Sequence, residues 1–250
     1  MALKQAREHP LLNPPPPGRL WDPQIIPPSD AKLMLERLHK CRQEVSGSTV
    51  ASLLVKLNEI GLDVQVTDDD VGMINRDIDN GIKTAESADG VRSSEVWWMI
   101  WDYYHLQKLS RPREITDDVR KIMYDKLEHE RFLGLNFGVA ALHFMLREIG
   151  LNTSVKGDEL EKMVGKIDHF RNVGNGREVA FAIYHLKKLG VDITPSKEDE
   201  QLMWATLDEA RTGAKVHLKG AMPDMYYYIK KLFYLDQPGS PDMPPLKKIA

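Results

Sequence analysis

A unit of about 40 residues recurs along this chain, and the recurrence restricts the possible folds more than any other feature of the sequence. The last apolar residues of alternate predicted helices lie 40, 49, 40 and 40 residues apart, at Leu38, Ile78, Leu127, Ile167 and Leu207. One helical turn earlier, on the same face, are Met34, Ile74, Met123, Met163 and Met203. We therefore expect five similar units, each with this face directed inward.

The ends of the second helices recur in step with the first series and locate an insertion. Gly61, Ser110, Gly150 and Gly190 are 49, 40 and 40 residues apart, and the fifth unit ends in YYIKKLF beside the YHLKKLG of the fourth. Both series place nine extra residues between Asp79 and Val96. Because these residues are small and polar, residues 79–95 of unit two are predicted to form an exposed loop.

The pattern between the proline-rich ends is helical. Apolar residues follow helical spacing in segments such as DELEKMVGKI and REVAFAIYHLKKLG, and strand-like alternation is almost absent. We predict an all-α fold in which each unit is a helix, a loop of about a dozen residues and a second helix. Units one and two occupy residues 31–110, units three and four 111–190, and unit five 191–236.

The two ends of the chain, residues 1–30 and 237–250, form proline-rich tails. Proline removes backbone donors and favours extended chain, so neither tail has the means to form its own core. Trp21, Ile25 and Ile26 are the apolar anchors that we expect to hold the N-terminal tail. We predict that Trp21 enters an apolar pocket that belongs at least partly to another chain, with docking on the protein's own body as the alternative.

Composition narrows the functional classes. The chain has 34 Lys and Arg against 37 Asp and Glu, a net charge of −3, so no basic surface for nucleic acid is expected. Cys41 is the only cysteine, which excludes an intrachain disulfide and favours a reducing, intracellular compartment. No run approaches the roughly 20 apolar residues that span a bilayer, so we expect no transmembrane segment.

The text VAALHFMLREIGLNTSVKGDELEKMVGKID, followed by HFRNVGNGREVAFAIYHLKKLG, is similar to the calmodulin-type EF-hand pattern. In that pattern a helix ends in Leu-Gly, a Ser- or Thr-capped acidic helix begins, and its last apolar residue precedes an Asp. The likeness extends to LKKLGVDITPSKEDEQLMWATLD and LNEIGLDVQVTDDDVGMINRDID, and covers residues 31–235. The resemblance implies five tandem EF-hand-like units, of which one needs a tail or another chain as its mate.

The loops that this resemblance implies lack the ligands for calcium. Such a loop needs oxygen ligands at positions 1, 3 and 5, a Gly at 6 and a bidentate Glu at 12. Counted from the anchors, position 12 is Val50, Val139 and Val179 in units one, three and four, and Lys219 in unit five. We therefore expect degenerate units without calcium or any other cofactor. A calmodulin-type calcium sensor, the alternative, would need one intact loop.

Signals for catalysis are weak, whereas large aromatic residues are abundant on two helices. The sequence has no HExxH and no Gly-rich phosphate loop with Lys, and His105 and His185 occupy equivalent repeat positions on a helix surface, so no enzymatic activity is expected. Adjacent aromatic residues cover more of a helix than one core face requires. We assign these aromatic residues to contacts with partner proteins or with a tail: Trp97, Trp98, Trp101, Tyr226, Tyr227 and Tyr228.

These features favour a non-catalytic structural subunit of a large protein assembly. The EF-hand resemblance points to axonemal microtubules or to a mitochondrial membrane complex, with a cytoplasmic, cytoskeletal location favoured over a mitochondrial one. An α-solenoid scaffold is a further alternative, in which adjacent helices stack nearly antiparallel. Paired EF-hand loops would instead join in a short two-strand bridge at Leu135 and its equivalents, so this bridge distinguishes the two folds.

Overall fold

The computed structural model describes residues 26–87, 90–134, 136–213 and 221–235. These residues contain no strand, which confirms the all-α prediction. Among them, no helix combines the length and the apolar character that crossing a bilayer requires. The helices are α1 (Pro28–Gln43), α2 (Gly47–Glu59), α3 (Asp68–Ala85), α4 (Ser94–Lys108), α5 (Asp117–Leu133), α6 (Asn136–Glu148), α7 (Gly157–Asn172), α8 (Gly176–Lys188), α9 (Lys197–Thr212) and α10 (Met222–Ile229), with a 3₁₀ turn η2 (Gly90–Arg92) and a π-helical end η4 (Lys230–Leu235).

Units one, three and four are tight helical hairpins, and the prediction of a loop of about a dozen residues is wrong for them. Residues 44–46 and 173–175 alone separate the helices of units one and four. Val50 and Val179, at the position of a calcium-binding Glu, lie inside α2 and α8 and are fully buried. The longer connections run between units instead, over residues 60–67, 109–116, 149–156 and 189–196.

The two-strand bridge expected of paired EF-hand loops is missing from the residues that the structure describes. Leu135 lies outside them, but its equivalents Ser46 and Asn175 are the N-cap residues of α2 and α8. Units one and four, which the structure describes throughout, thus have the expected helices but short turns between them and no strand. Hairpins joined by eight-residue links are the arrangement expected of the α-solenoid alternative.

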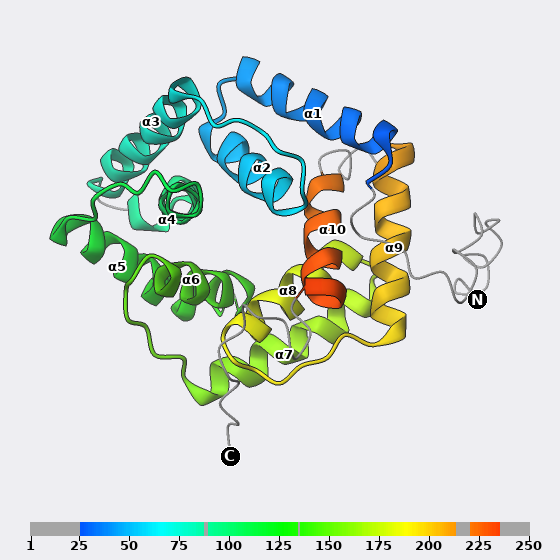
Figure 1. Ribbon diagram of the computed structural model, residues 1–250. Helices are drawn as coiled ribbons and strands as arrows, with labels where there is room; N and C mark the ends of the chain where they lie inside the picture. The colour runs from blue at the N-terminus through cyan, green and yellow to red at the C-terminus, as the bar shows by residue number, and fades with distance from the viewer. Residues whose placement is uncertain (1–25, 88–89, 135, 214–220, 236–250) are drawn as a thin grey trace.

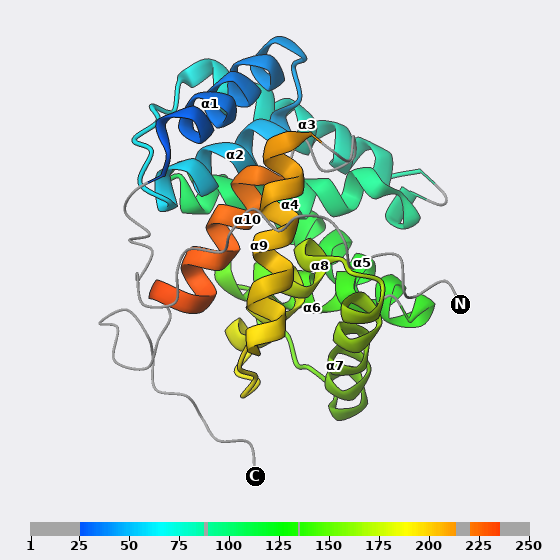
Figure 2. The ribbon, with the colours of Figure 1, turned by 90° about the vertical axis from the view of Figure 1, so that its right-hand side faces the viewer.

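The five hairpins close into a ring (Figure 1). The odd-numbered helices lie on the outside and the even-numbered helices line the inside. Each inner helix packs on the next, from α2 through α4, α6 and α8 to α10, and α10 packs back on α2. The side view in Figure 2 shows α9 and α10 beside α1 and α2, so the last unit adjoins the first.

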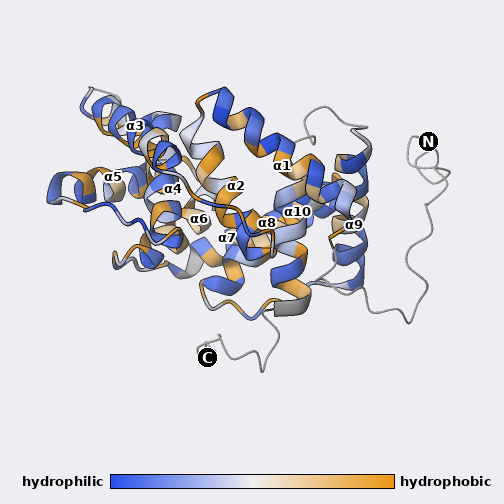
Figure 3. Cartoon of the chain, turned by 45° about the horizontal axis from the view of Figure 1, so that its top comes forward, coloured by the Kyte–Doolittle hydropathy of each residue, from blue (hydrophilic) through white to orange (hydrophobic). Residues whose placement is uncertain are grey.

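The core is formed by the repeated apolar positions. All five anchors and the five residues one turn before them are at most 2% exposed. Figure 3 shows the resulting two-sided helices, with apolar faces turned toward neighbouring helices and polar faces turned outward. This confirms the inward-facing surface predicted from the repeat, and it explains why each unit needs its neighbours to complete a core.

The insertion in unit two is only partly an exposed loop. α3 ends seven residues after Ile78, whereas the other outer helices end five or six residues after their anchors. Glu86 and Ser87 are exposed, but Gly90 is buried, and a Cβ there would lie 1.7 Å from the carbonyl oxygen of Thr84. The buried Lys126 of α5 donates to the carbonyl of Ser93 at 3.1 Å. The insertion is therefore fastened to unit three.

Candidate functional site

A charged contact joins consecutive outer helices at four of the five junctions between units. In each case an arginine four residues after the anchor of one helix binds an acidic residue eight residues before the anchor of the next. The shortest N–O distances in the four pairs are 2.6 to 2.7 Å. The pairs are Arg42–Asp70, Arg131–Glu159, Arg171–Asp199 and Arg211–Asp30.

The acidic partner also caps its own helix. Asp70 accepts a hydrogen bond from the backbone N–H of Thr67 at 3.0 Å, and Asp199 accepts one from Ser196 at 2.9 Å. Burial raises the pKa of each carboxyl group, but the hydrogen bonds from arginine and cap outweigh it and hold the pKa below its ordinary value. Each carboxylate therefore ties a helix start to the preceding unit.

The junction between α3 and α5 replaces this pair with apolar residues. Ile82 and Val119 occupy the positions of the arginine and the acid, and both belong to the apolar core. The insertion in unit two lies at this junction, where Lys126 pairs with Glu130 at 2.8 Å and holds Ser93. Both positions of the charged pair are thus apolar at this junction.

The fourth pair closes the ring. Arg211 Nε lies 2.6 Å from Asp30 Oδ2, although the two residues are 181 positions apart. The hydroxyl group of Tyr226 also donates to Asp30 Oδ2 and accepts from Arg211. Asp30, at the start of α1, is 6% exposed. Its carboxylate pairs with the charged Arg211 of α9 and accepts a hydrogen bond from Tyr226 of α10.

A cluster of three charges, two of them buried, lies on the inner helices where the ring closes. Asp224 of α10 receives Lys56 Nζ from α2 at 2.6 Å and Arg177 from α8 at 2.5 Å. The side chains of Lys56 and Asp224 are 8% and 9% exposed. Burial raises the pKa of Asp224, but Lys56 and Arg177 together hold it below its usual range. The carboxylate is therefore ionised and joins three inner helices.

Aromatic rings and imidazoles surround Lys56 at the centre of the ring. The remaining cavity is about 10 Å³, roughly room for one water molecule. Lys56 Nζ lies 5.5 Å from the ring centroid of Trp101, and the hydroxyl groups of Tyr184 and Tyr227 are 2.8 Å apart. The lining residues come from four inner helices and are Val55, Lys56, Trp101, Tyr104, His105, Tyr184, His185, Tyr227 and Tyr228.

His105 and His185 make the same bond in two units. The Nδ1 atom of each lies 2.7 Å from the carbonyl oxygen four residues earlier, Trp101 and Phe181, and donates to it. Burial lowers the pKa of both imidazoles to about 3. Both histidines are buried rather than on a helix surface, which corrects our prediction, and at neutral pH they are uncharged core residues.

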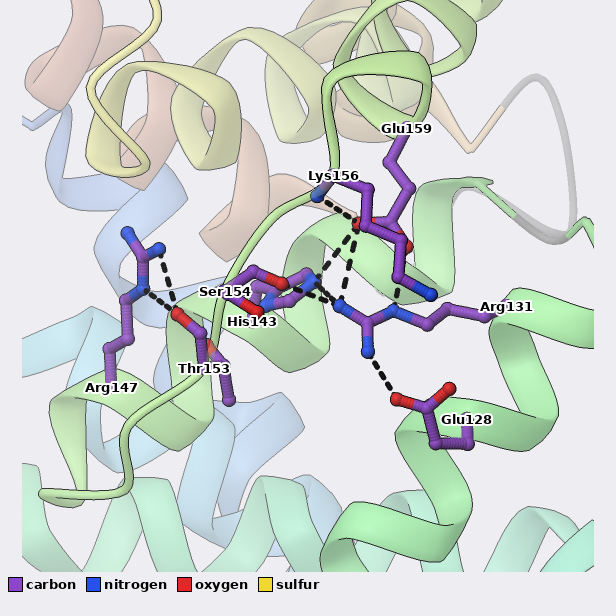
Figure 4. A network of polar contacts seen from close by, with 8 residues as sticks. All are labelled: Glu128, Arg131, His143, Arg147, Thr153, Ser154, Lys156 and Glu159. Atoms are coloured by element: carbon purple, nitrogen blue, oxygen red, sulfur yellow. Dashed lines mark hydrogen bonds and ion pairs between the residues drawn. The ribbon is translucent and has the colours of Figure 1, made fainter.

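Figure 4 shows a second polar network, where α5, α6 and α7 meet. Arg131 is 2.6 Å from Glu159 and donates to the carbonyl of Ser154 at 2.6 Å, and its Nη2 lies 3.1 Å from Nε2 of His143. His143 is fully buried, and burial, followed by Arg131, lowers its pKa to about 4. A neutral His143 acts in this network as a packed hydrogen-bonding group.

Asp102 of α4 is a buried carboxyl group at a position that is apolar in other units. The corresponding residues are Leu53, Leu142 and Ala182. Asp102 is 0% exposed and receives one bond, from the hydroxyl group of Ser48 at 2.7 Å, while Asp77 binds the backbone N–H of Ser48 at 3.0 Å. Burial raises the pKa of Asp102 to about 8, opposed by Ser48 and assisted by Asp77. Asp102 is therefore mostly protonated at neutral pH.

The predicted partner-binding residues fall into three groups. Trp21 and Ile25 lie outside the described residues, while Ile26 is partly buried against the core. Trp98 is 48% exposed and Trp97 is half-buried. Trp101, Tyr226, Tyr227 and Tyr228 are buried in this chain's own core, so they offer no surface to a partner, and we correct their assignment. The need for aromatic packing across a closed ring explains their abundance.

The residues described contain no group of three or more His, Cys, Asp or Glu side chains arranged to hold a metal ion. No family model matches the chain, and neither the curated proteins nor the solved structures give a match. Sequence reasoning missed the Lys56–Asp224–Arg177 cluster, whose members are remote in the chain. It also missed Asp102, although comparison of the units at that position would have revealed it.

Proposed function

We propose that this chain is a non-catalytic structural subunit, a closed helical ring that holds other protein subunits in a large assembly. The proposal rests on the contacts that the charged and imidazole side chains near the ring centre make within this chain. Lys56, Asp224 and Arg177, together with His105 and His185, are used in contacts within and between units. The ring centre keeps about 10 Å³, too little for a substrate. These side chains thus stabilise the packing of the ring.

The exposed indole of Trp98 supports a role in binding proteins. Trp98 packs edge-on against Trp97 with ring centroids 5.1 Å apart, and Trp97 stacks on the buried Trp101 at 5.2 Å. A large aromatic side chain held rigid by its neighbours is a typical anchor at protein interfaces. We assign the partner contact that the sequence suggested to Trp98, with Trp97 as its support.

The sequence offers two alternative functions, an α-solenoid scaffold and a calcium sensor. The short turns and stacked hairpins favour the α-solenoid scaffold, and the closed ring is a special form of it. A calcium sensor is not favoured, because the ligand positions Val50 and Val179 lie within helices. The EF-hand resemblance remains a prediction, and so do the axonemal and mitochondrial assemblies to which it points.

The test is purification of the tagged chain from its native cells, followed by native mass spectrometry. We expect a stoichiometric partner with the wild type and a weakened complex with Trp98→Ala. Val164→Ala, at a residue 40% exposed on α7, is the matched control and should retain the partner. Wild-type protein that is monomeric in native extracts, or equal binding by both variants, would contradict the proposal.

A further inference from the structure

We propose that unit five, α9 with α10, is exchanged between two copies of this chain, so that each ring of a dimer contains unit five of the other copy. The contact of unit five with unit one is called the closing junction here. It consists of Arg211 and Tyr226 with Asp30, Lys56 with Asp224, and Lys231 with Glu59 at 2.5 Å. This junction is the one place where the ring closes without a chain link.

The closing junction repeats the contact found between consecutive units. Arg211 and Asp30 occupy the same repeat positions as Arg171 and Asp199, and both pairs have N–O distances near 2.7 Å. The two sides of the junction are different surfaces that fit each other, not one surface that fits itself. Unit five of a second copy therefore presents the surface that unit one already binds.

At the closing junction the outer helix packs less closely on the inner helix of the preceding unit than it does at internal junctions, whereas α10 packs on α2 as α4 does on α6. α3 packs on α2 so closely that a Cβ on Gly47 would lie 2.6 Å from the carbonyl oxygen of Met73, and α9 approaches Gly176 of α8 in the same way. α1 has no comparable packing on the described part of α10. Leu33, the equivalent of Met73, is 45% exposed, whereas Met73 is 8% exposed.

Charged contacts hold this junction, and they favour specific pairing over strength. Ionic groups lose hydration on burial, so a buried ion pair adds little net stability while strongly selecting its partner. Lys56 with Asp224 is such a pair, and Asp30 is similarly buried. The junction therefore selects unit five, and the unit five of a second copy meets its requirements as well as that of its own chain does.

The link at residues 189–196 is the hinge that such an exchange requires. Side chains fasten the corresponding links elsewhere: Asn58 binds the backbone N–H of Val64 at 2.6 Å, and Arg147 binds the carbonyl of Thr153 at 3.0 Å. Within the described chain, the hydrogen bonds of residues 190–195 are backbone bonds, from Gly190 to Lys187, from Val191 to Leu186 and from Ile193 to Val191. A changed path of this link moves Val191 and Ile193, which pack against the core, and the dimer has to pack them again together with every contact of unit five.

Charge reversal tests the exchange. D30R and R211D each place like charges at the closing junction of their own ring. When the two variants are refolded together and unit five is exchanged, one ring pairs the two new residues and the other ring regains the native pair. We expect a heterodimer in native mass spectrometry, about tenfold more abundant than in a control mixture, because exchange removes the like-charge contacts from both rings.

R131E and E159R, refolded together, are the control, because the junction between units three and four stays within one chain in either form. Persistent monomers in the D30R and R211D mixture, with both proteins helical by circular dichroism, would overturn the proposal. The wild type gives a second measurement that does not depend on variant folding. Isotope-labelled and unlabelled chains should form mixed-mass dimers after joint refolding, and monomers alone would also overturn it.

Discussion

Arg211 donates to Asp30 across 181 residues of sequence, and this contact joins the last outer helix to the first. The pair has the same repeat positions as the charged pairs inside the chain. A contact used between neighbours therefore also turns a linear array into a ring.

Removal of the Asp30 carboxylate should destabilise the protein strongly. Asp30→Ala leaves Arg211 and Tyr226 without their shared acceptor at a buried site, and we expect a loss of about 3 kcal/mol in the free energy of unfolding. Urea unfolding followed by circular dichroism measures it. Glu36→Ala, on the same helix, removes an exposed pair with Lys32 at 3.8 Å and should change stability by less than about 0.5 kcal/mol. Equal losses would contradict this ranking.

Asp102 should make the protein less stable as the pH rises. Its folded pKa of about 8 lies above the ordinary value of 3.8, so the folded state keeps a proton that the unfolded state has lost. Between pH 4 and 8 its contribution should fall by about 1.4 kcal/mol per pH unit, and it should be constant above pH 8. Asp102→Asn should show a growing advantage over the wild type in urea unfolding from pH 5 to pH 9. A constant difference would rule out the raised pKa.

Two residues adopt a left-handed backbone conformation that other units assign to glycine. Val45 has φ 55° where Gly134 and Gly174 stand in units three and four, and Ser110 has φ 56° where other units have glycine. A left-handed conformation costs a residue with a Cβ roughly 1–2 kcal/mol, and the freedom of glycine in the unfolded chain partly offsets the gain from replacing that residue.

Val45→Gly and Ser110→Gly should each therefore raise the free energy of unfolding by about 0.5–1 kcal/mol. Val173→Gly is the control, because Val173 has an ordinary φ of −89° at an equally exposed turn. That variant should gain nothing in thermal unfolding. A gain in the control as large as in the other two would show that strain is not the cause.

Lys56→Met should lower the free energy of unfolding by about 3 kcal/mol, because Asp224 then stays buried with Arg177 alone. The lowered pKa of Asp224 gives stability that is present above its ordinary pKa and lost as the pH falls through the folded value. Without Lys56 the pKa of Asp224 is lowered less, so urea unfolding at a series of acid pH values should show a smaller loss of stability below pH 3.8 in the variant than in the wild type. Lys108→Met, at a pair with Glu148 that is about a third exposed, should change little.

Thermal unfolding should have the same midpoint in excess chelator and in millimolar calcium. The helices of units one and four are joined by three-residue turns, and the positions that would ligate calcium in an EF-hand are helical. A rise of more than a few degrees in calcium would reveal a binding site, since a ligand that binds the folded state raises its stability. Magnesium at the same ionic strength is the control.

The repeat register predicted the core because it depends only on periodicity. Leu38 and its equivalents are buried in every unit, as the spacing required. The predicted loops are too long because the EF-hand resemblance, and not the periodicity, sets their limits. Glycine seven residues after the anchor, at Gly134 and Gly174, signals a short left-handed helix end and would have shortened them.

The period of the sequence repeat does not predict that the units close into a ring. Curvature depends on how closely neighbouring helices approach, as at Gly47, and small packing differences accumulate over the units. Lys56 and Asp224 are 168 residues apart and share no motif, so no local pattern connects them. Asp102 was predictable in principle, since it is a polar residue at a position that is apolar in Leu53 and Leu142.

The closed arrangement also constrains how such a gene is able to change. In an open solenoid, duplication of one repeat simply lengthens the protein, because both ends remain free. Here α10 must return to α2, so each hairpin supplies one fifth of a full revolution. A sixth copy would force every bend angle to change at once or leave the circle unclosed. We therefore expect point substitutions and insertions within a hairpin, as in unit two, to preserve the ring, and gain or loss of a whole hairpin to break it.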